Sequence, residues 1–472
     1  MKRTFRCTAA SLLLATAASA QTPAATGHWQ ASIQANPTTE LTAYFDLEGT
    51  APALTGAMSV PQQTPKPFPL SSIIVRHDSL LLAVEALHGS FAGRFSADGQ
   101  QVAGAWVQNG KTFPLTLRRR STQDKAAAPR RPQSPHAPFP YRSQDLTFPN
   151  KKAGFDLAGT LTLPTGAGPF PAVVLVTGSG AQDRDETLLG HQPFLVLADY
   201  LTRRGFAVLR YDDRGVGQSK GVFKDALTTD FTTDAQAALA YLRTRPDIRP
   251  HQVALMGHSE GGSIVWQAAA QPGGPDLAVA LAGPGLPGDA ILLRQQKDLA
   301  KANGADSASI GAQYRLYRAL FAELHRVPAT LPTEELMARL TPIAQQQMPG
   351  TSAGQIRPIV AQLASPWMRA FLLTDPAPYF AKLKCPVLAI NGTHDLQVAA
   401  DENLPAIARA LHAAHNRDVT TRALPQLNHL FQTDPAAKAD YGNIEETFAP
   451  AALQVIGDWL SARTGPKAVA GR

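Results

Sequence analysis

The chain has 472 residues, of which 44% are hydrophobic and 17% are charged, a composition that suits globular domains with a substantial core. Its length predicts two or three domains, and its formal net charge of +7 is mild. Cys385 is the single cysteine outside the first twenty residues. One cysteine allows neither an internal disulfide nor a cysteine-based zinc cluster, and we expect no metal and no cofactor.

The first twenty residues predict a secretory signal peptide. A basic start at residues 2–6 precedes an apolar run at 9–18, and the small residues 18–20 form a cleavage site before Gln21. Cleavage removes three positive charges and leaves +4. No cysteine stands at the cut, and no later apolar run approaches the ~20 residues that span a bilayer. We therefore expect an exported protein, periplasmic or secreted, that is cleaved near Ala20 and has no membrane span.

Residues 21–120 predict a small all-β domain, either a barrel or a sandwich of six to eight strands. Short alternating runs are separated by turn residues, and "SADGQQ" and "QNGK" carry the Asp-Gly and Asn-Gly pairs of tight hairpins. We expect Trp29 and Trp106 to fill the interior of this domain, with a ligand-binding role for them as the alternative.

Residues 121–142 predict an interdomain linker, because they contain five prolines and no periodicity. One arginine run, 118–120, directly precedes this segment, and another, 130–131, lies among its prolines. We interpret both as solvated charges beside the linker and expect no nucleic-acid partner.

From residue 143 to 472 the pattern becomes one of strands alternating with helices. Continuous apolar strands bounded by helices are typical of a mostly parallel sheet covered on both faces. Residues 289–384 interrupt this alternation with helical periodicity and no convincing strand. We interpret them as a helical lid inserted into the domain, and a separate helical domain is the alternative.

The stretch "VALMGHSEGGSIV", residues 253–265, predicts a nucleophile at Ser259. It matches G-x-S-x-G, and it lies between an apolar strand and a helix, as a nucleophile elbow requires. Gly257 and Gly261 leave room for the sharp turn. A serine hydroxyl is a weak nucleophile and needs a base within hydrogen-bond reach. We expect His258, beside the serine, to give packing or polar support.

In this motif's fold the acid and then the base follow the serine in chain order. Asp395, in "AINGTHD", ends a predicted strand, and His429, in "LPQLNHLF", follows the next one. We predict Asp395 as the acid, with Asp401 as the alternative, and His429 as the base. The other histidines near the end of the chain are His394, His412 and His415.

A tetrahedral intermediate needs N–H donors at its oxyanion. We predict the main-chain N–H of Glu260 as one donor and that of Ser179, in "TGSGAQDRDE", as the other, with Gly180 as the alternative. Two acids of the same loop, Asp183 and Asp185, are expected to form salt bridges with Arg184 or Arg214 rather than to touch substrate. In "YDDRGVGQS", we expect Asp213 and Arg214 to brace the loop.

Five motifs in this order, "TGSGAQDRDE", "YDDRGVGQS", "GHSEGG", "NGTHDLQV" and "LNHLF", resemble the α/β-hydrolase superfamily. The similarity is to secreted bacterial esterases related to dienelactone hydrolases and to serine aminopeptidase-like hydrolases. It implies an eight-stranded sheet, a helical cap and hydrolysis through an acyl-enzyme. The chain departs from many relatives at Thr177, where they have histidine before the oxyanion glycine. The β-rich first domain resembles an accessory domain found ahead of some such hydrolases.

The resemblance leaves three hypotheses for function. The first is a carboxylesterase that acts on a small-molecule ester. The second is a serine peptidase of the same fold, for which Glu334 and Glu335 could bind a free amino terminus. The third is a non-catalytic binding protein that uses the β domain. The sequence does not specify the oligomeric state. For the first hypothesis we expect the lid to supply the pocket residues Leu320, Phe321, Trp367, Met368, Phe371 and Leu372.

Overall fold

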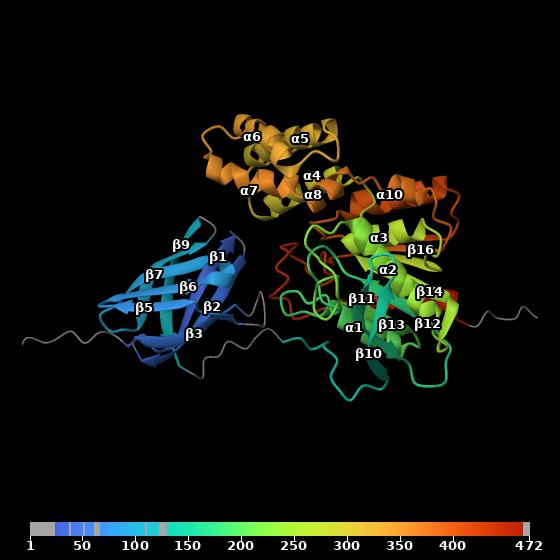
Figure 1. Ribbon diagram of the computed structural model, residues 1–472, viewed down its shortest axis with the longest axis horizontal. Coiled ribbons are helices and arrows are strands. Elements are labelled where there is room, and N and C mark those ends of the chain that lie inside the picture. Colours follow the sequence, from blue (N-terminus) through green and yellow to red (C-terminus); the bar gives the residue numbers. More distant parts are fainter. Residues whose placement is uncertain are drawn as a thin grey trace, which may run out of the picture. The chain divides into compact units, whose positions relative to one another are not determined.

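The computed structural model describes residues 24–36, 39–50, 52–60, 67–108, 111–121 and 130–465. The protein divides into two compact units, one within residues 1–126 and a larger one whose main part is 127–472 (Figure 1). The predicted signal peptide and residues 122–129 of the predicted linker lie outside the described residues.

The N-terminal unit is one antiparallel sheet of nine strands in the described residues, ordered β4-β3-β2-β1-β9-β8-β7-β6-β5. The sheet is a half-barrel rather than a sandwich, and it has more strands than predicted. The predicted Asp98-Gly99 turn connects β7 and β8, whereas Asn109-Gly110 falls outside the described residues. The strands are β1 Gly27–Asn36, β2 Thr39–Thr50, β3 Ala53–Ser59, β4 Phe68–Pro69, β5 Ser72–Arg76, β6 Ser79–Val84, β7 Gly89–Phe95, β8 Gln101–Gln108 and β9 Lys111–Arg120.

The interior of this half-barrel is packed with aromatic side chains. Trp29 and Trp106 are fully buried in it, as predicted, and the indole N–H of Trp29 donates to the main-chain oxygen of Ala25 at 2.9 Å. A buried indole needs such a partner for its N–H. Both tryptophans therefore belong to the core of the unit.

The arginine run 118–120 lies in β9; its interpretation as solvated charge holds for Arg118, which is exposed, and is wrong for Arg119 and Arg120. The Arg119 guanidinium lies over the ring of Trp29, 4.3 Å from its centroid, and donates to the main-chain oxygen of Thr26 at 2.7 Å. Arg120 lies over Tyr44 and pairs with Asp46 at 3.2 Å. These two arginines hold strands of the half-barrel together.

The larger unit confirms the predicted α/β fold. Its eight strands follow the order β10-β11-β13-β12-β14-β15-β16-β17, and all neighbours from β13 to β17 are parallel. Only β11 runs against its two neighbours. The strands are β10 Arg142–Asn150, β11 Phe155–Leu163, β12 Phe170–Val176, β13 Ala207–Tyr211, β14 Ile248–His258, β15 Leu277–Leu281, β16 Val387–Gly392 and β17 Val419–Leu424.

Helices cover both faces of this sheet, because its central strands are apolar on both sides. Val174 and Leu255 face the side covered by α2 (Thr228–Arg243), α3 (Glu260–Ala269) and α10 (Ala400–Ala413). Alternate residues, such as Val173 and Met256, face the side covered by α1 (Pro193–Arg203) and α11 (Pro450–Thr464). The parallel strands then place every following loop at one edge of the sheet, where sites of this fold class lie.

The predicted lid is confirmed as a group of helices, which we call the cap (Figure 1). It has an apolar core of its own, which includes Leu320, Leu336 and Val360. The chain then returns directly to the sheet through β16. The cap helices are α4 Gly288–Ala302, α5 Ser307–Arg326, α6 Thr333–Gln347, α7 Ala353–Ala364, α8 Pro366–Leu373 and α9 Ala377–Phe380.

Residues 130–141 run along the larger unit and are hydrogen-bonded to it. The Arg131 guanidinium donates to the main-chain oxygens of Gly442 and Leu189 at 2.8 and 3.0 Å. The side-chain oxygen of Gln133 accepts the amides of Thr447 and Phe448 at 2.6 and 2.9 Å. Arg131 is therefore a partly buried anchor rather than the solvated charge that we expected.

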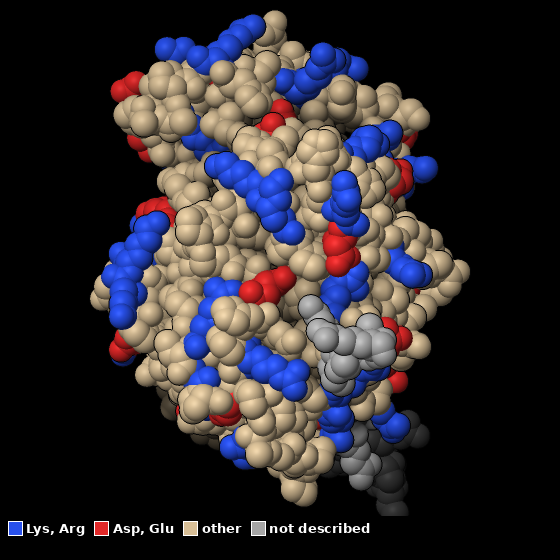
Figure 2. All heavy atoms as spheres, turned by 90° about the vertical axis from the view of Figure 1, so that its right-hand side faces the viewer, with Lys and Arg blue, Asp and Glu red and all other residues tan. Residues whose placement is uncertain are grey.

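On the face shown in Figure 2, lysine and arginine side chains are spread out, with acidic side chains between them. This face therefore carries mixed charge rather than one continuous basic area. None of the helices in the described ranges is long and apolar enough to cross a membrane.

Candidate active site

Ser259 occupies a strained turn between β14 and α3. Its φ of 53° and ψ of −115° are rarely adopted by a residue with a side chain. The turn is possible because its neighbours are small: a Cβ on Gly257 would lie 2.0 Å from the Gly261 main-chain oxygen. A Cβ on Gly261 would lie 2.3 Å from the main-chain oxygen of Val176. The sequence-based explanation of these two glycines is thus confirmed.

Two groups of main-chain N–H donors lie beside this turn. Glu260 is the first residue of α3, so its amide has no carbonyl partner within the helix. On the other side, a Cβ on Gly178 would lie 3.4 Å from the Cβ of Ser259, which places the loop after β12 against the serine. The next residues, Ser179 and Gly180, are exposed. We call residues 177–186 the oxyanion loop, because they include the predicted oxyanion donor Ser179.

Asp395 and His429 lie together in the structure. The Oδ2 atom of Asp395 is 2.8 Å from Nδ1 of His429, and both side chains are buried. The other carboxylate oxygen, Oδ1, accepts the main-chain amides of Gln397 and Val398 at 2.7 and 2.9 Å. The carboxylate is therefore fixed by its own loop and presents one oxygen to the imidazole.

The alternative acid, Asp401, faces elsewhere. It lies in the first turn of α10 and pairs with Arg294 of the cap at 3.2 Å. Among the other histidines, His394 contacts the Asp434 main-chain oxygen at 2.7 Å, His412 lies in the last turn of α10, and His415 follows that helix.

The three predicted residues follow β14, β16 and β17, which end at the same edge of the sheet. His258, the last residue of β14, connects two of these loops. Its Nε2 atom lies 3.0 Å from the main-chain oxygen of His429, and the two imidazole rings are 4.9 Å apart at their centroids. The structure therefore brings the loops of Ser259 and His429 into direct contact.

His258 also contacts a residue that the sequence did not single out, Glu186. The Oε1 atom of this buried carboxylate lies 2.9 Å from Nδ1 of His258 and accepts the Gly178 amide at 2.8 Å. Glu186 has a φ of 52°, unusual for glutamate. The only sequence signal was its place in "TGSGAQDRDE", because its partner is 72 residues away. Polar support by His258, as expected, is confirmed.

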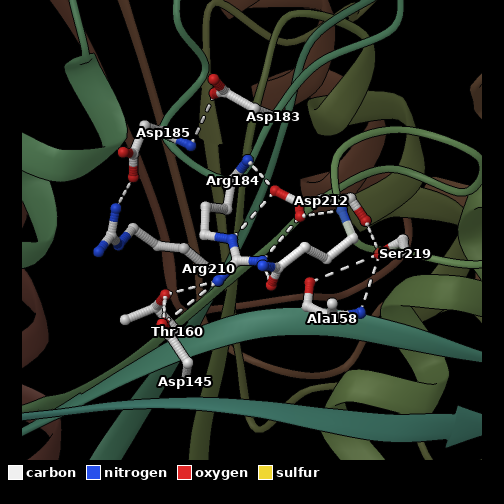
Figure 3. Close-up of polar contacts among 10 residues, drawn as sticks. Asp145, Ala158, Thr160, Asp183, Arg184, Asp185, Arg210, Asp212 and Ser219 are labelled. Atoms are coloured by element: carbon white, nitrogen blue, oxygen red, sulfur yellow. Dashed lines mark hydrogen bonds and ion pairs between the residues drawn. The ribbon is translucent and has the colours of Figure 1, made fainter.

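Ion pairs fasten the oxyanion loop to neighbouring strands (Figure 3). The Arg184 guanidinium donates two hydrogen bonds, of 3.0 and 2.7 Å, to the Asp212 carboxylate. It also donates to the Thr160 hydroxyl at 2.8 Å. Asp185 pairs with Arg210. The structural role expected for the loop acids is confirmed, but their partners differ: Asp183 accepts the amides of Asp185 and Thr187 rather than pairing with arginine.

The Asp213 side chain braces the oxyanion loop rather than its own loop, 211–219, which we expected it to brace. Its carboxylate accepts the Thr177 hydroxyl at 2.8 Å and the Gln182 amide at 3.0 Å. Burial raises the pKa of Asp213 to about 7, against the lowering effect of these hydrogen bonds. Arg214, by contrast, pairs with Asp234 at 2.7 Å. The hydroxyl of Thr177 thus ties the start of the loop to Asp213.

The carboxylate of Glu260 links the elbow to the cap. Its Oε1 atom accepts the Thr228 hydroxyl at 2.6 Å and the indole N–H of Trp367, in α8, at 2.9 Å. Burial raises the pKa of Glu260, and the two hydrogen bonds oppose this shift. We expected the main-chain N–H of Glu260 to matter more than its carboxylate, whereas the carboxylate also connects the elbow with the cap.

Most of the predicted pocket residues of the lid do not face the elbow. Four of them lie in the cap's own core, so their assignment to a substrate pocket was wrong; they are Leu320, Phe321, Met368 and Leu372. Trp367 and Phe371 are only partly buried, and their rings stack 5.7 Å apart. Helical periodicity identifies a buried face but does not say which neighbour buries it.

Within the described ranges, no three His, Cys, Asp or Glu side chains gather into a group that could hold a metal ion. What the described groups can supply is a serine in a strained turn, an imidazole fixed by a carboxylate, and main-chain N–H donors.

The sequence model of the family described as X-Pro dipeptidyl-peptidase (S15 family) matches residues 153–418. This range contains Ser259 and Asp395 and ends before His429. Among curated proteins, esterase EstD of Thermotoga maritima is 35% identical over 143 residues, which are 30% of this chain and 34% of the esterase. A putative carboxymethylenebutenolidase of Synechocystis is 27% identical over 134 residues, which are 27% of this chain and 53% of that protein.

The matched regions thus span about a third and about half of these two relatives. Among solved structures, an esterase of Pyrococcus furiosus is similar with a TM-score of 0.43 at 16% identity. The similarity covers 69% of this chain and 92% of that one.

Proposed function

This chain belongs to the X-Pro dipeptidyl-peptidase (S15) family, and from that premise we propose that it is a serine hydrolase that cleaves carboxylic esters through an acyl-enzyme. One observation carries the proposal: Asp395 holds His429 at 2.8 Å, and the His429 loop is hydrogen-bonded to the residue before Ser259. An acid, a base and a strained serine at one sheet edge are the parts that nucleophilic acyl transfer needs.

In the first step, Oγ of Ser259 attacks the ester carbonyl carbon while Nε2 of His429 takes the hydroxyl proton. The Asp395 carboxylate accepts the Nδ1–H of His429 and so stabilises the imidazolium. His429 then gives the proton to the departing alkoxide, which leaves as the alcohol. Water, deprotonated by His429, releases the acid and restores Ser259.

The negative charge of the tetrahedral intermediate falls on the former carbonyl oxygen. We assign its donors to the amides of Glu260 and Ser179, with Gly180 as the alternative to Ser179. The N-terminus of α3 adds the positive end of a helix dipole. The Gly178 amide is unsuitable because Glu186 already accepts it.

The family description favours a second candidate, a peptidase that acts on X-Pro bonds. Esterase EstD, one of the similar curated proteins, favours an ester as the substrate. Glu334 and Glu335, the acids considered for binding an amino terminus, are exposed in the first turn of α6, in the cap. We keep a small-molecule carboxylic ester as the first candidate substrate. We also propose that residues 1–20 direct the export of the protein.

The deciding experiment compares hydrolysis of p-nitrophenyl acetate and butyrate with that of glycyl-prolyl p-nitroanilide. We expect ester turnover that is lost in Ser259→Ala and a fluorophosphonate label on Ser259 alone. Faster turnover of the anilide would support the peptidase instead. Full activity of Ser259→Ala, or a label on another serine, would overturn the mechanism.

A further inference from the structure

His258 lies where three loops of the larger unit meet. Its Nδ1 atom faces Glu186 in the oxyanion loop at 2.9 Å, and its Nε2 atom faces the main-chain oxygen of His429 at 3.0 Å. Through Glu186 it also reaches the Gly178 amide, which immediately precedes the donor assigned to Ser179. One buried side chain therefore connects the elbow, the oxyanion loop and the loop of the base.

The partners of His258 define its protonation. A carbonyl oxygen can only accept, so the Nε2 atom that faces His429 carries a proton. The Nδ1 atom faces a carboxylate oxygen that already accepts the Gly178 amide. With Glu186 ionised, this oxygen can only accept, so both ring nitrogens donate and the ring is an imidazolium beside a carboxylate. Burial alone would lower the pKa of His258, but Glu186, the His429 carbonyl and Asp395 raise it above its ordinary value.

We propose that Glu186 and His258 are a buried ion pair that positions the oxyanion loop against the loop of His429. Both are positioning residues: they act on the reaction through Gly178 and His429 and touch no reacting atom. The inference rests on the proposed function, because it assigns the purpose of these contacts to catalysis at Ser259.

The charge of Glu186 is needed to keep its contacts with Gly178 and His258 at the same time. In Glu186→Gln, the amide oxygen could still accept from Gly178, but the imidazole would lose its counter-charge and become neutral. Nε2 would keep the one remaining proton for the His429 carbonyl, leaving Nδ1 without one. The glutamine could then satisfy Nδ1 only by turning its NH₂ group toward it and releasing the Gly178 amide.

We therefore expect Glu186→Gln to lower kcat for p-nitrophenyl butyrate by about 10- to 100-fold, less than the loss of an oxyanion donor itself. KM should stay within about twofold. Asp276→Asn is the matched control, because Asp276 also accepts a main-chain amide, that of Val253 at 2.9 Å, and pairs with Arg243. Asp276 directly precedes β15, at the edge of the sheet opposite Ser259, so Asp276→Asn should lower stability and leave kcat unchanged. An equal loss of kcat in both variants would overturn the proposal.

A double-mutant cycle tests whether the two residues act as one unit. The double variant Glu186→Gln/His258→Gln should lose no more kcat than His258→Gln alone, because each change already breaks the pair. Losses that multiply would mean independent roles and would contradict the proposal.

The protonation of His258 has a readout that does not depend on activity. In protein labelled with 15N at histidine, both ring nitrogens of His258 should remain protonated at pH 7.5, and Glu186→Gln should remove one proton. A neutral His258 in the parent protein would refute the ion pair. If Ser259→Ala stays active while the 15N result is as expected, the proposed function fails and the ion pair stands.

Discussion

The indole N–H of Trp367 in the cap donates to the carboxylate of Glu260, the residue after Ser259, at 2.9 Å. The oxygen that accepts it, Oε1, also accepts the Thr228 hydroxyl. Because the same residue supplies the main-chain N–H assigned to the oxyanion, the position of the cap is linked directly to the elbow. Burial of the carboxylate makes each of its hydrogen bonds costly to lose.

Trp367→Phe should weaken the contact between the cap and Glu260. The phenyl ring can keep the stacking on Phe371, so the main loss is the hydrogen bond to Glu260, on the order of 1.5–3 kcal/mol of stability. Urea unfolding and limited proteolysis of the cap would measure it. Tyr317→Phe, which alters another cap aromatic, should leave the rate of cleavage within the cap unchanged; similar rates in both variants would contradict the link.

Asp395→Asn should abolish most of the activity while the fold persists. The side-chain oxygen of the asparagine would stay on the amides of Gln397 and Val398, and its NH₂ group would face Nδ1 of His429. The imidazole would then carry its proton on Nε2, where it cannot accept the proton of Ser259. We expect kcat to fall about 1,000- to 10,000-fold.

Asp401→Asn is the matched control for this substitution, because Asp401 is the other acid considered and is an exposed residue that pairs with Arg294. It should keep nearly full kcat, since a surface ion pair contributes roughly 0–1 kcal/mol. A larger loss in Asp401→Asn than in Asp395→Asn would reverse the assignment of the acid.

Gly257→Ala should destabilise the larger unit severely. The added methyl group would lie 2.0 Å from the main-chain oxygen of Gly261, where only a backbone shift could make room. We expect a loss of at least about 3 kcal/mol in the free energy of unfolding, measured in urea. Gly311→Ala, in helix α5, meets only the flexible end of Arg315 at 3.5 Å and should stabilise the protein by about 0.5–1 kcal/mol.

Asp213 should make the protein less stable as the pH rises from 5 to 8. Burial raises the pKa of its carboxyl to about 7 in the folded state, against 3.8 ordinarily. Between these values the folded state binds more protons than the unfolded state, so stability falls with rising pH and levels off above 7. The contribution between pH 5 and 8 is about 3 kcal/mol at most.

The Asp213→Asn variant removes this titration. Urea unfolding at both pH values should show that the variant loses less stability between pH 5 and 8 than the parent protein does. An equal loss in the two proteins would show that other groups carry the pH dependence.

Much of the larger unit could be predicted, because local patterns of apolar residues along the sequence indicate its strands and helices. Apolar runs such as 172–176 and 253–256 can be buried only in a sheet covered on both faces, and the lid stands out by its helical period. Ser259 could be predicted as a nucleophile because a nucleophile elbow needs small neighbours at fixed spacing, here Gly257 and Gly261. Chain order then pointed to Asp395 and His429.

The errors arose where two side chains far apart in sequence had to meet. The cap residues Leu320 and Leu372 have the same periodicity whether they line a pocket or fill the cap's own core. Arg119 precedes a proline-rich segment in the sequence. It nevertheless lies in β9, and its guanidinium lies over the ring of Trp29. The N-terminal unit also has more strands than predicted, because the pairing of segments far apart in sequence decides how many strands form.

The sequence by itself determined which segments are strands and helices, where the sharp turn at Ser259 falls, and which acid and histidine follow it. These features depend on side-chain size, apolar period and chain order, which neighbouring residues specify. Only the tertiary structure decided that Glu186 meets His258 and that Trp367 meets Glu260. A hydrogen bond requires two atoms to lie about 3 Å apart, and for residues 72 and 107 positions apart only the packing of the whole larger unit sets that distance.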